Sequence, residues 1–426
     1  MKVRQLLPLV DVSTTAHDST DPATAFTRFP NRILDWDPCV CIVGVGFVGE
    51  SLLRRFGSAY ACIGFDISAE RIRALSSRFE KQKNVQLTSQ VSRLALATHY
   101  FISVPTLLNE DNSVDFTYVN SAIDTVLQYA RPGSCIVIES SVPIGTTRRL
   151  LGPYVDLFYC GMSPERIDPG RTSPSAAEIP KVVSGLTPLA LKKITAMYSR
   201  VFDTVVPVSK PEVAEMTKLY ENCYRMVNIA YVNEISDACR SHNIDPHEMI
   251  NAAATKPFGF QAFQPGLGVG GHCIPINPYY LFANNKNLPI LKRATNLMLN
   301  RPRKLAKRFY KRLMASICAT GQVAQTSLPR ILIVGIGFKA GQSELSASPG
   351  LAFAKGLAEL GCARLAYHDP LVNDARLDWL EKLNIACWNS TYIESEFDAV
   401  AICNRQDKVD LAILEGFSKD RVHYFV

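Results

Sequence analysis

One cysteine of this sequence stands where its thiol could do chemistry. Cys273 closely follows residues 266–271, a six-residue stretch that contains four glycines. Glycine permits positive φ angles and lets the backbone approach a ligand closely, so a thiol at the end of this loop could reach a bound substrate. If a helix begins just after Cys273, its unpaired N–H groups would favour the thiolate. The alternative is that Cys273 is a small apolar side chain buried beside a tight turn.

Two further polar residues lie on a long predicted helix. Residues 212–240 contain no glycine or proline, and their apolar side chains recur at helical spacing. This pattern predicts about 28 helical residues, or roughly 42 Å of helix. We expect a helix of that length to link domains or to form a dimer surface. Lys218 and Asn222 are four residues apart and therefore point to the same side, although each taken alone could be an ordinary surface residue.

The N-terminal part of the sequence predicts a dinucleotide-binding unit. Residues 39–43 form a continuous apolar run, as expected of a strand buried on both faces, and lead into the GxGxxG pattern at 44–49. A helical stretch and a second short strand at 61–65 follow, and Asp66 comes next. The glycines would admit a pyrophosphate at the helix N-terminus, and Asp66 would accept hydrogen bonds from ribose hydroxyls and repel a 2′-phosphate. The spacing therefore favours NAD over NADP, although Asp66 could also be a turn residue.

Two more strands are predicted at 100–104 and 135–139, and each leads into a polar or proline-containing loop. These loops carry Thr106 and Ser141. Ligands of open parallel sheets bind at the carboxyl ends of the strands, so we expect both residues near the ligand.

A second Rossmann-like unit is expected in the C-terminal part. Residues 330–339 repeat the strand-then-GxG pattern, followed by a helix at 351–360 and strands at 363–368 and 398–403. The third glycine of the pattern is missing, which suggests a second nucleotide-type ligand rather than a second NAD.

Composition restricts the class of protein. The chain has 426 residues, 47% of them hydrophobic and 20% charged, which is typical of a soluble protein of two or three domains. No apolar run reaches 18 residues, so we expect no membrane span. The net charge of +7 is spread along the chain and suits an anionic substrate. The basic run at 301–312 reads as the solvated face of a helix rather than a nucleic-acid site.

The cysteines indicate a reducing, cytoplasmic location. Twelve are present, but only Cys39 and Cys41 lie close together in sequence, and their spacing fits packing on one face of a strand. We therefore expect neither a disulfide framework nor a metal site. Residues 1–37 mix acidic and basic side chains without the pattern of a secretory signal or transit peptide, and are predicted to be a disordered extension.

From residue 38 onward, the sequence resembles the UDP-glucose/GDP-mannose dehydrogenase family. The motifs that carry the resemblance are VGVGFVGE (43–50), ISVPT (102–106), ESSVPIGTT (139–147), SPERIDPGR (163–171), IPKVVSG (179–185), AEMTKLYENCYRMVNIAYVNE (214–234), AAATKPFGF (252–260), PGLGVGGHCIP (265–275) and GFK (337–339). Within the family, several of these motifs look closest to enzymes that act on UDP-N-acetylhexosamines, UDP-N-acetylglucosamine in particular.

The resemblance implies an α/β architecture of two Rossmann-like domains joined by a long central helix and a helical middle domain. The expected parts are the extension at 1–37, an NAD-binding domain at 38–210, a helical central and dimerisation domain with the catalytic cysteine at 211–310, and a UDP-sugar-binding domain at 325–426. A homodimer through the long helix is expected.

The family's reaction is the four-electron oxidation of a sugar C6 alcohol to a carboxylate, with two NAD reduced in turn. A cysteine thiolate captures the aldehyde as a thiohemiacetal, and water later cleaves the thioester. By position, Cys273 is the nucleophile, Lys218 and Asn222 stabilise the oxyanion, Glu165 activates water, and Ser141 positions it.

The resemblance also assigns binding residues. The cofactor set is Gly44, Gly46, Phe47, Val48, Gly49, Asp66, Arg71, Thr106 and Ser141. The substrate set is Glu165, Arg166, Lys218, Asn222, Lys256, Gly270 and Lys339.

The sequence departs from the family at several positions near this chemistry. Asn277 stands four residues after Cys273, where the family commonly has an acid, and an amide cannot take a proton. Ser346 replaces an arginine expected to meet cofactor phosphate, Leu107 replaces a proline, and the sequence lacks the arginine-bearing D-x-R that family members have near the C-terminus. Two alternatives therefore stay open: a catalytically impaired nucleotide-sugar-binding homologue or dimer partner, and a dehydrogenase that stops at the aldehyde or uses another nucleotide sugar.

Overall fold

The structure, a computed structural model, describes residues 38–167, 175, 178–319, 328–361, 364–406, 409–418 and 420–425. The extension predicted at 1–37 lies outside the described residues.

The first of two large sheets in the described part of the chain has eight strands in the order β10-β9-β8-β7-β4-β1-β2-β3, and every pairing except β8 with β9 is parallel. Its strands are β1 (Cys39–Val43), β2 (Ala61–Phe65), β3 (Val85–Thr88), β4 (His99–Ile102), β7 (Cys135–Ile138), β8 (Tyr159–Met162), β9 (Lys181–Gly185) and β10 (Val205–Pro207). The helices of this part are α1 (Phe47–Phe56), α2 (Ala69–Phe79), α3 (Thr117–Tyr129), α4 (Thr146–Leu151) and α5 (Pro188–Tyr198), and β5 (Leu107–Leu108) and β6 (Val114–Asp115) form a small antiparallel pair.

The apolar runs predicted as strands are buried on both sides of this sheet. Cys41 and Val43 belong to one core cluster, and Val40 and Ile42 belong to the other, because successive side chains of a strand point to opposite faces. Cys39 packs against the same cluster as Cys41, so the predicted packing role of this cysteine pair is confirmed.

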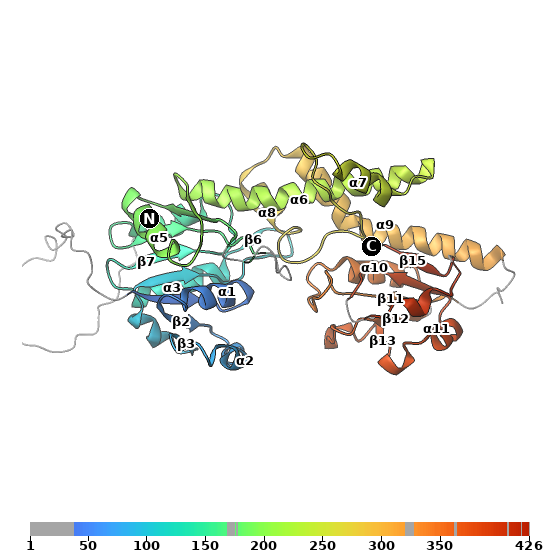
Figure 1. Ribbon diagram of the computed structural model, residues 1–426, viewed down its shortest axis with the longest axis horizontal. Helices are drawn as coiled ribbons and strands as arrows, with labels where there is room; N and C mark the ends of the chain where they lie inside the picture. Colours follow the sequence, from blue (N-terminus) through green and yellow to red (C-terminus); the bar gives the residue numbers. More distant parts are fainter. Residues whose placement is uncertain are drawn as a thin grey trace, which may run out of the picture. The chain divides into compact units, whose positions relative to one another are not determined.

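The long helix is confirmed as α6 (Pro211–Cys239), which contacts β8 and β9 near its start and α9 further along (Figure 1). The other central helices are α7 (Pro246–Ala254), α8 (Asn277–Asn284) and α9 (Pro289–Ala319). Buried residues of α6, α8 and α9 form a core of their own, including Leu219, Met226, Tyr280 and Met298.

The second sheet has five strands, all parallel, in the order β13-β12-β11-β14-β15. They are β11 (Arg330–Val334), β12 (Arg364–His368), β13 (Glu381–Lys382), β14 (Ala399–Ile402) and β15 (Val422–Tyr424), and the described helices beside them are α10 (Pro349–Ala358) and α11 (Ser390–Glu396). The expected boundary at residue 310 falls inside α9, whose later residues Leu305, Phe309 and Leu313 pack into the core of this sheet.

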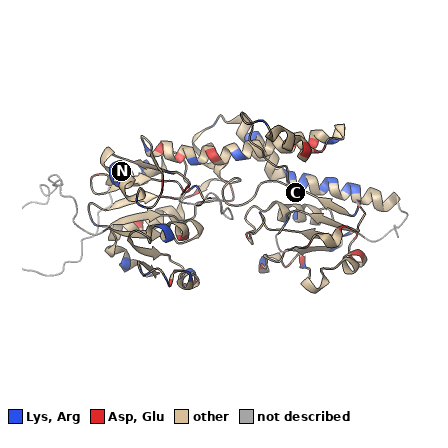
Figure 2. Cartoon of the chain, viewed as in Figure 1, with Lys and Arg blue, Asp and Glu red and all other residues tan. Residues whose placement is uncertain are grey.

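The basic run at 301–312 lies on α9, where Lys and Arg follow the helix (Figure 2). Lys304, Lys307, Arg308 and Lys311 are exposed, while Leu305, Ala306 and Phe309 between them are buried. This pattern confirms the prediction of a solvated helix face.

The third glycine is absent from the pattern after β11, as the sequence indicated. A glycine later in the chain, Gly350 in the first turn of α10, lies against this loop instead. A Cβ atom on Gly350 would lie 2.9 Å from the Gly335 carbonyl oxygen, so this position needs glycine for the same close helix-to-loop packing that Gly49 provides in the first unit.

Candidate active site

The glycine loop after β1 has the geometry of a pyrophosphate cradle. Gly44 has a φ of +87° and donates its N–H to the Phe65 carbonyl oxygen at 2.8 Å. A Cβ atom on Gly49 would collide with the Gly44 carbonyl oxygen, whereas a Cβ atom on Gly46 would meet nothing within 4 Å. Gly46 also caps α1 without any side-chain hydrogen bond, so the first N–H groups of the helix are not satisfied by a capping side chain.

Asp66 stands at the carboxyl end of β2, where a ribose would lie. Its Oδ2 atom accepts from the Val45 N–H at 3.0 Å, and Oδ1 accepts from the Ser68 N–H at 2.9 Å. The carboxylate is half-buried, and each oxygen has a second lone pair for a further donor. Arg71 binds the loop itself, with Nε donating to the Val45 carbonyl at 2.8 Å. These residues fit a bound NAD.

Of the other predicted cofactor residues, Phe47 is exposed and Val48 half-buried in the first turn of α1. The Thr106 hydroxyl donates to the Ser141 carbonyl oxygen at 2.7 Å, so the loops after β4 and β7 meet. Glu215 of α6 holds the later part of the loop after β7. Its carboxylate accepts hydrogen bonds from the N–H groups of Gly145 at 2.5 Å and Thr147 at 2.8 Å.

The glycine-rich loop before Cys273 is packed against the second sheet's loops. A Cβ atom on Gly270 would lie 2.9 Å from the Phe338 Cβ atom, and Gly271, with a φ of +83°, donates its N–H to the Ser346 carbonyl at 2.9 Å. These two glycines are therefore required by protein packing and backbone conformation, a reason that the sequence did not reveal. Lys339 follows Phe338 directly and is half-buried.

A helix does not begin immediately after Cys273. Helix α8 starts at Asn277, and the N–H groups of Ile276 and Asn277 donate to the carbonyl oxygen of Cys273, at 3.3 and 3.0 Å. The Cys273 side chain is half-buried. The expected helix N-terminus thus lies four residues further along.

Lys218 interacts electrostatically with both Cys273 and Glu165. The Lys218 side chain is buried, with 8% of its surface exposed. Burial lowers the pKa of its ammonium, and the electrostatic interactions of Lys218 with Cys273 and Glu165 oppose that shift. Three predicted catalytic residues, from α6, the glycine-rich loop and the loop after β8, therefore interact.

Asn222 lies one turn after Lys218 on α6 and is also buried. Its Nδ2 group donates to Oδ1 of Asn277, and its own Oδ1 accepts from the Arg225 guanidinium. Both asparagines are almost fully buried. The predicted alternative, that Lys218 and Asn222 are ordinary surface residues, is wrong.

Glu165 is held by more partners than the sequence indicated. Its Oε1 atom accepts the N–H groups of Arg166 at 2.6 Å and Ile167 at 2.8 Å, and its Oε2 atom accepts from the Lys181 ammonium at 3.2 Å. Lys181 also binds Oε2 of Glu139 at 2.6 Å, and the Tyr198 hydroxyl donates to Oε1 of Glu139. Sequence reasoning missed this cluster, although Glu139 directly follows one apolar strand and Lys181 begins another.

The other basic residues predicted to bind the substrate have different surroundings. Arg166 binds Glu221 of α6 at 2.6 Å and donates to the Pro180 carbonyl at 2.7 Å. Lys256 is exposed, with its Nζ atom 4.9 Å from the centroid of the Phe258 ring. None of the interactions above links Lys256 to the Cys273 cluster.

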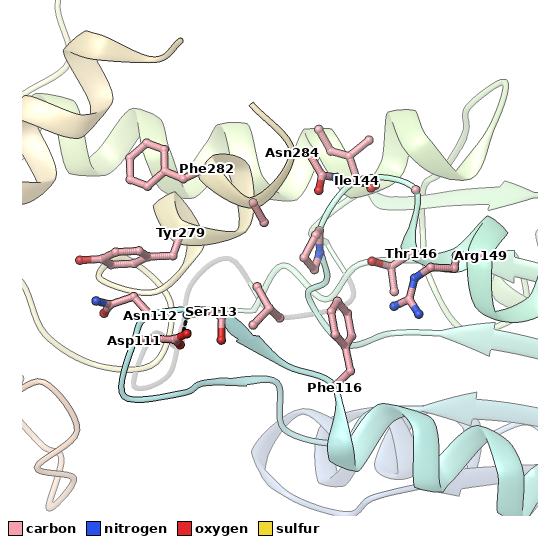
Figure 3. A pocket seen from close by; sticks show the side chains of 14 residues that line it. Asp111, Asn112, Ser113, Phe116, Ile144, Thr146, Arg149, Tyr279, Phe282 and Asn284 are labelled. Carbon is pink, nitrogen blue, oxygen red and sulfur yellow. Dashed lines mark hydrogen bonds between the residues drawn. The ribbon is translucent and has the colours of Figure 1, made fainter. Parts of the chain in front are cut away.

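A separate cavity of about 790 Å³ is lined by three segments of the chain (Figure 3). Its wall comes from segments that follow Thr106, Ser141 and Asn277 in the sequence, and it includes Phe116, Arg149, Tyr279, Phe282 and Asn284. The Asn284 amide donates to the Ile144 carbonyl at 2.5 Å, and the Arg149 guanidinium lies 4.6 Å from the centroid of the Phe116 ring. Sequence reasoning did not predict this cavity, because its wall combines three distant segments.

The sheets and the clustered thiol, lysine and carboxylate define an NAD-dependent dehydrogenase of the two-Rossmann type. Family comparison agrees: residues 39–205 match the NAD binding domain, and residues 212–299 the central domain, of the UDP-glucose/GDP-mannose dehydrogenase family. The chain belongs to this family, a family of NAD-dependent oxidoreductases, and the resemblance read from the motifs is confirmed.

Relatives of this chain include proteins named for two different sugars. Protein CapL of Staphylococcus aureus is 36% identical over 262 residues, which cover 57% of this chain and 61% of CapL. The UDP-N-acetyl-D-glucosamine 6-dehydrogenase of Salmonella typhi is 33% identical over 263 residues, again 57% of this chain and 61% of the relative. The UDP-N-acetyl-D-mannosamine dehydrogenase of Methanococcus maripaludis is 28% identical over 355 residues, 78% of this chain and 79% of that protein. With CapL and the Salmonella enzyme, the match spans about three fifths of the relative's length.

Solved structures show the same fold. The UDP-D-ManNAc dehydrogenase of Pyrococcus horikoshii superposes with a TM-score of 0.78 at 24% identity, covering 91% of this chain and 93% of that one. None of the helices in the described residues is long and apolar enough to cross a membrane.

Proposed function

We propose that this protein oxidises the C6 alcohol of a UDP-N-acetylhexosamine to the carboxylate, using Cys273 as a covalent nucleophile. The observation that carries the proposal is the electrostatic grouping of Cys273, Lys218 and Glu165 beside the Asn222–Asn277 pair. The substrate class follows from relatives named for UDP-N-acetylglucosamine and UDP-N-acetylmannosamine. Bound NAD would accept one hydride in each of the two oxidations.

Each residue of the group has a chemical task. The Cys273 thiolate would attack the C6 aldehyde, and the oxyanion that forms would lie near the Lys218 ammonium and the Asn222 amide. Because Lys218 is buried, its charge acts with little screening by water. After the second oxidation, the thioester needs water, and the ionised Glu165 would accept a proton from it. Cleavage then releases the carboxylate and restores the thiol.

For binding, the Gly44–Gly49 loop and Asp66 would hold the pyrophosphate and the adenosine ribose of NAD. Lys339 and Arg166 are proposed contacts to the UDP-sugar, and Lys256 is a further one. The family places the sugar nucleotide against the second sheet, whose Phe338–Lys339 loop packs on Gly270 here.

A second candidate is a nucleotide-sugar-binding protein with impaired turnover. Asn277 favours it, because the buried amide cannot accept the proton that an acid at this position would take. Ser346 adds to the argument, since its hydroxyl hydrogen-bonds to Nδ1 of His272 at 3.2 Å and brings no cation to the loop. A third candidate is an enzyme that stops at the aldehyde. In such an enzyme Cys273 would form no covalent bond with the substrate.

The deciding experiment supplies the purified protein with NAD and either UDP-N-acetylglucosamine or UDP-N-acetylmannosamine. Two NADH per uronic acid would establish the four-electron reaction. A thioester that stays on Cys273, detected by mass spectrometry of the protein, would place the defect at hydrolysis. One NADH per aldehyde would select the third candidate, and NAD binding without any NADH would select the second.

We also propose a homodimer through α6. Met216, Tyr220, Tyr224 and Tyr231 are large exposed apolar side chains on this helix, and the first three follow one another at four-residue spacing. A row of this kind on one helix face is typical of a surface that a second copy covers. Free thiols throughout the described residues fit a proposed cytoplasmic location.

A further inference from the structure

A buried group of charges lies behind Glu165 and is not part of the reaction proposed above. Glu139 follows β7, Lys181 begins β9, and Glu165 follows β8. The Lys181 ammonium is 2.6 Å from Glu139 and 3.2 Å from Glu165, and it also donates to the Pro164 carbonyl at 3.2 Å. The side chains of Lys181 and Glu139 are 2% and 0% exposed.

Ionic side chains in a core are costly, because their loss of hydration is repaid only by well-placed partners. Apolar residues of similar volume would fill this part of the core equally well. Here, in contrast, all the donors around Glu165 are arranged for a carboxylate: two backbone N–H groups on Oε1 and the Lys181 ammonium on Oε2. The arrangement favours the ionised form of the one residue that the reaction needs as a base.

Other charged groups also face the cluster. Lys218 of α6 acts on Glu165 from the side of Cys273, and Arg55 of α1 interacts with Glu165 and Asp203. The Tyr198 hydroxyl of α5 donates to Glu139, and its ring lies 5.6 Å from the Lys181 ammonium. Burial would raise the pKa of Glu165, but Lys181, the N–H of Arg166 and Lys218 outweigh it, and the net shift is downward.

We propose that Lys181 is a positioning residue for thioester hydrolysis, which holds the Glu165 carboxylate ionised and oriented while Glu139 and the Pro164 carbonyl hold the Lys181 ammonium in place. The inference rests on the proposed role of Glu165 as the base for the hydrolytic water. The inference adds a statement about the acid limb, the fall of kcat at low pH. The pH at which this fall occurs is determined by residues behind Glu165 that do not touch the substrate.

The test compares variants of the whole protein by the pH profile of kcat. In Lys181→Met the carboxylate of Glu165 loses its nearest cation, so we expect the acid limb to move up by about one pH unit, a tenfold loss at a fixed pH on that limb. Lys181→Arg keeps a cation and should restore most of the profile. Lys192→Met, an exposed lysine of α5, is the matched control and should leave the profile unchanged.

Glu139→Gln should leave the limb in place. Burial raises the pKa of Glu139 to about 7, so this side chain is already uncharged on the acid limb, and the amide keeps an oxygen acceptor for Lys181. The first hydride transfer, measured as the burst of NADH, should keep its rate in all four variants, while the thioester on Cys273 accumulates in Lys181→Met. A folded Lys181→Met protein whose kcat falls by one factor at every pH would overturn the inference. If Lys181→Met does not fold, Lys181→Gln, which keeps a hydrogen-bond donor without the charge, should move the limb up as well, and an unmoved limb in that variant overturns the inference.

Failure of the proposed function would look different. In that case the wild-type protein itself would yield no second NADH, whatever the variants do. Infrared difference spectra against Glu165→Gln would then follow the protonation of Glu165 directly, without turnover. A Glu165 titration that is the same in wild-type and Lys181→Met protein would still reject the role of Lys181.

Discussion

The side-chain amide of Asn222 donates a hydrogen bond to Oδ1 of Asn277, at the start of α8. Both residues are almost fully buried, and the Oδ1 atom of Asn222 is in turn bound by Arg225. An amide oxygen at position 277 thus accepts the bond that a carboxylate oxygen could accept in other family members. The substitution keeps the geometry and removes only the capacity to take up a proton.

Asn277→Asp should therefore raise turnover without disturbing the fold. The carboxylate keeps an acceptor for Asn222 and adds a group that can hold a proton, so we expect hydrolysis of the thioester to accelerate by roughly tenfold. Steady-state NADH production, compared with the initial burst, measures this step. Asn277→Ala, which loses the bond, is the control and should be slower than wild type. Equal steady-state rates for Asn277→Asp and wild type would show that the amide does not limit turnover.

Replacing Cys273 by Ala should abolish formation of the carboxylate, with a loss on the order of 10³-fold or more, because no thiolate captures the aldehyde. NAD affinity should not change, since the NAD cradle lies on the loop after β1. The covalent adduct on the protein, detected by mass spectrometry, should disappear as well. Cys318→Ala removes an exposed thiol of α9 and is the matched control. Persistence of the adduct in Cys273→Ala would assign the nucleophile elsewhere.

The two glycines of the cradle should separate binding from stability. Gly46→Ala places a methyl group in open space, so the free energy of unfolding should stay within about 0.5 kcal/mol while NAD affinity falls by about tenfold or more. Gly49→Ala drives its Cβ into the Gly44 carbonyl, and we expect about 1–3 kcal/mol of destabilisation. Denaturant unfolding and NAD titration check both. Tight NAD binding by Gly46→Ala would contradict the cradle.

Tyr220 is 66% exposed on the outer face of α6 and should anchor the proposed dimer. Tyr220→Glu would place a charge in an apolar interface, so sedimentation should show a shift from dimer to monomer. Tyr424→Glu changes a tyrosine on β15 that is 50% exposed, and is the control. A wild-type protein that sediments as a monomer at micromolar concentration would remove the dimer proposal.

Glu139 predicts a pH dependence of stability. Burial raises its pKa to about 7, although Lys181 opposes the shift. The unfolded chain therefore loses this proton at lower pH than the folded protein, and the contribution of Glu139 to stability, complete below about pH 4.5, declines as the pH rises through 7. The effect is on the order of 3 kcal/mol.

Glu139→Gln isolates that contribution, since Glu165, whose pKa is lowered, acts in the opposite sense in both proteins. Denaturant unfolding of wild type and Glu139→Gln at pH 5 and pH 8 measures it. The stability difference between the two proteins should move in favour of the variant as the pH rises. A constant difference would mean that Glu139 stays in one protonation state.

Much of the cofactor site follows from sequence because its parts are local. One strand, one turn and one helix bring Gly44, Gly46 and Gly49 together, and the next strand places Asp66 beside them. The hydrogen bond from the Val45 N–H to Asp66 spans only 21 residues, within a single βαβ unit of fixed handedness. Apolar runs and helical periodicity likewise predicted β1, β2 and α6 closely.

Sequence spacing did not reveal what depends on contacts between distant segments. Gly350 packs against the loop after β11 although it lies outside the glycine pattern, and Gly270 is required by Phe338 of the same loop. The pairing of Glu139 with Lys181 depends on β8 lying between β7 and β9, one of its neighbours parallel and the other antiparallel. Residue types and local spacing thus determined the cofactor cradle and the nucleophile, while strand order decided the charges behind Glu165, because buried ions are stable only where the fold brings their partners together.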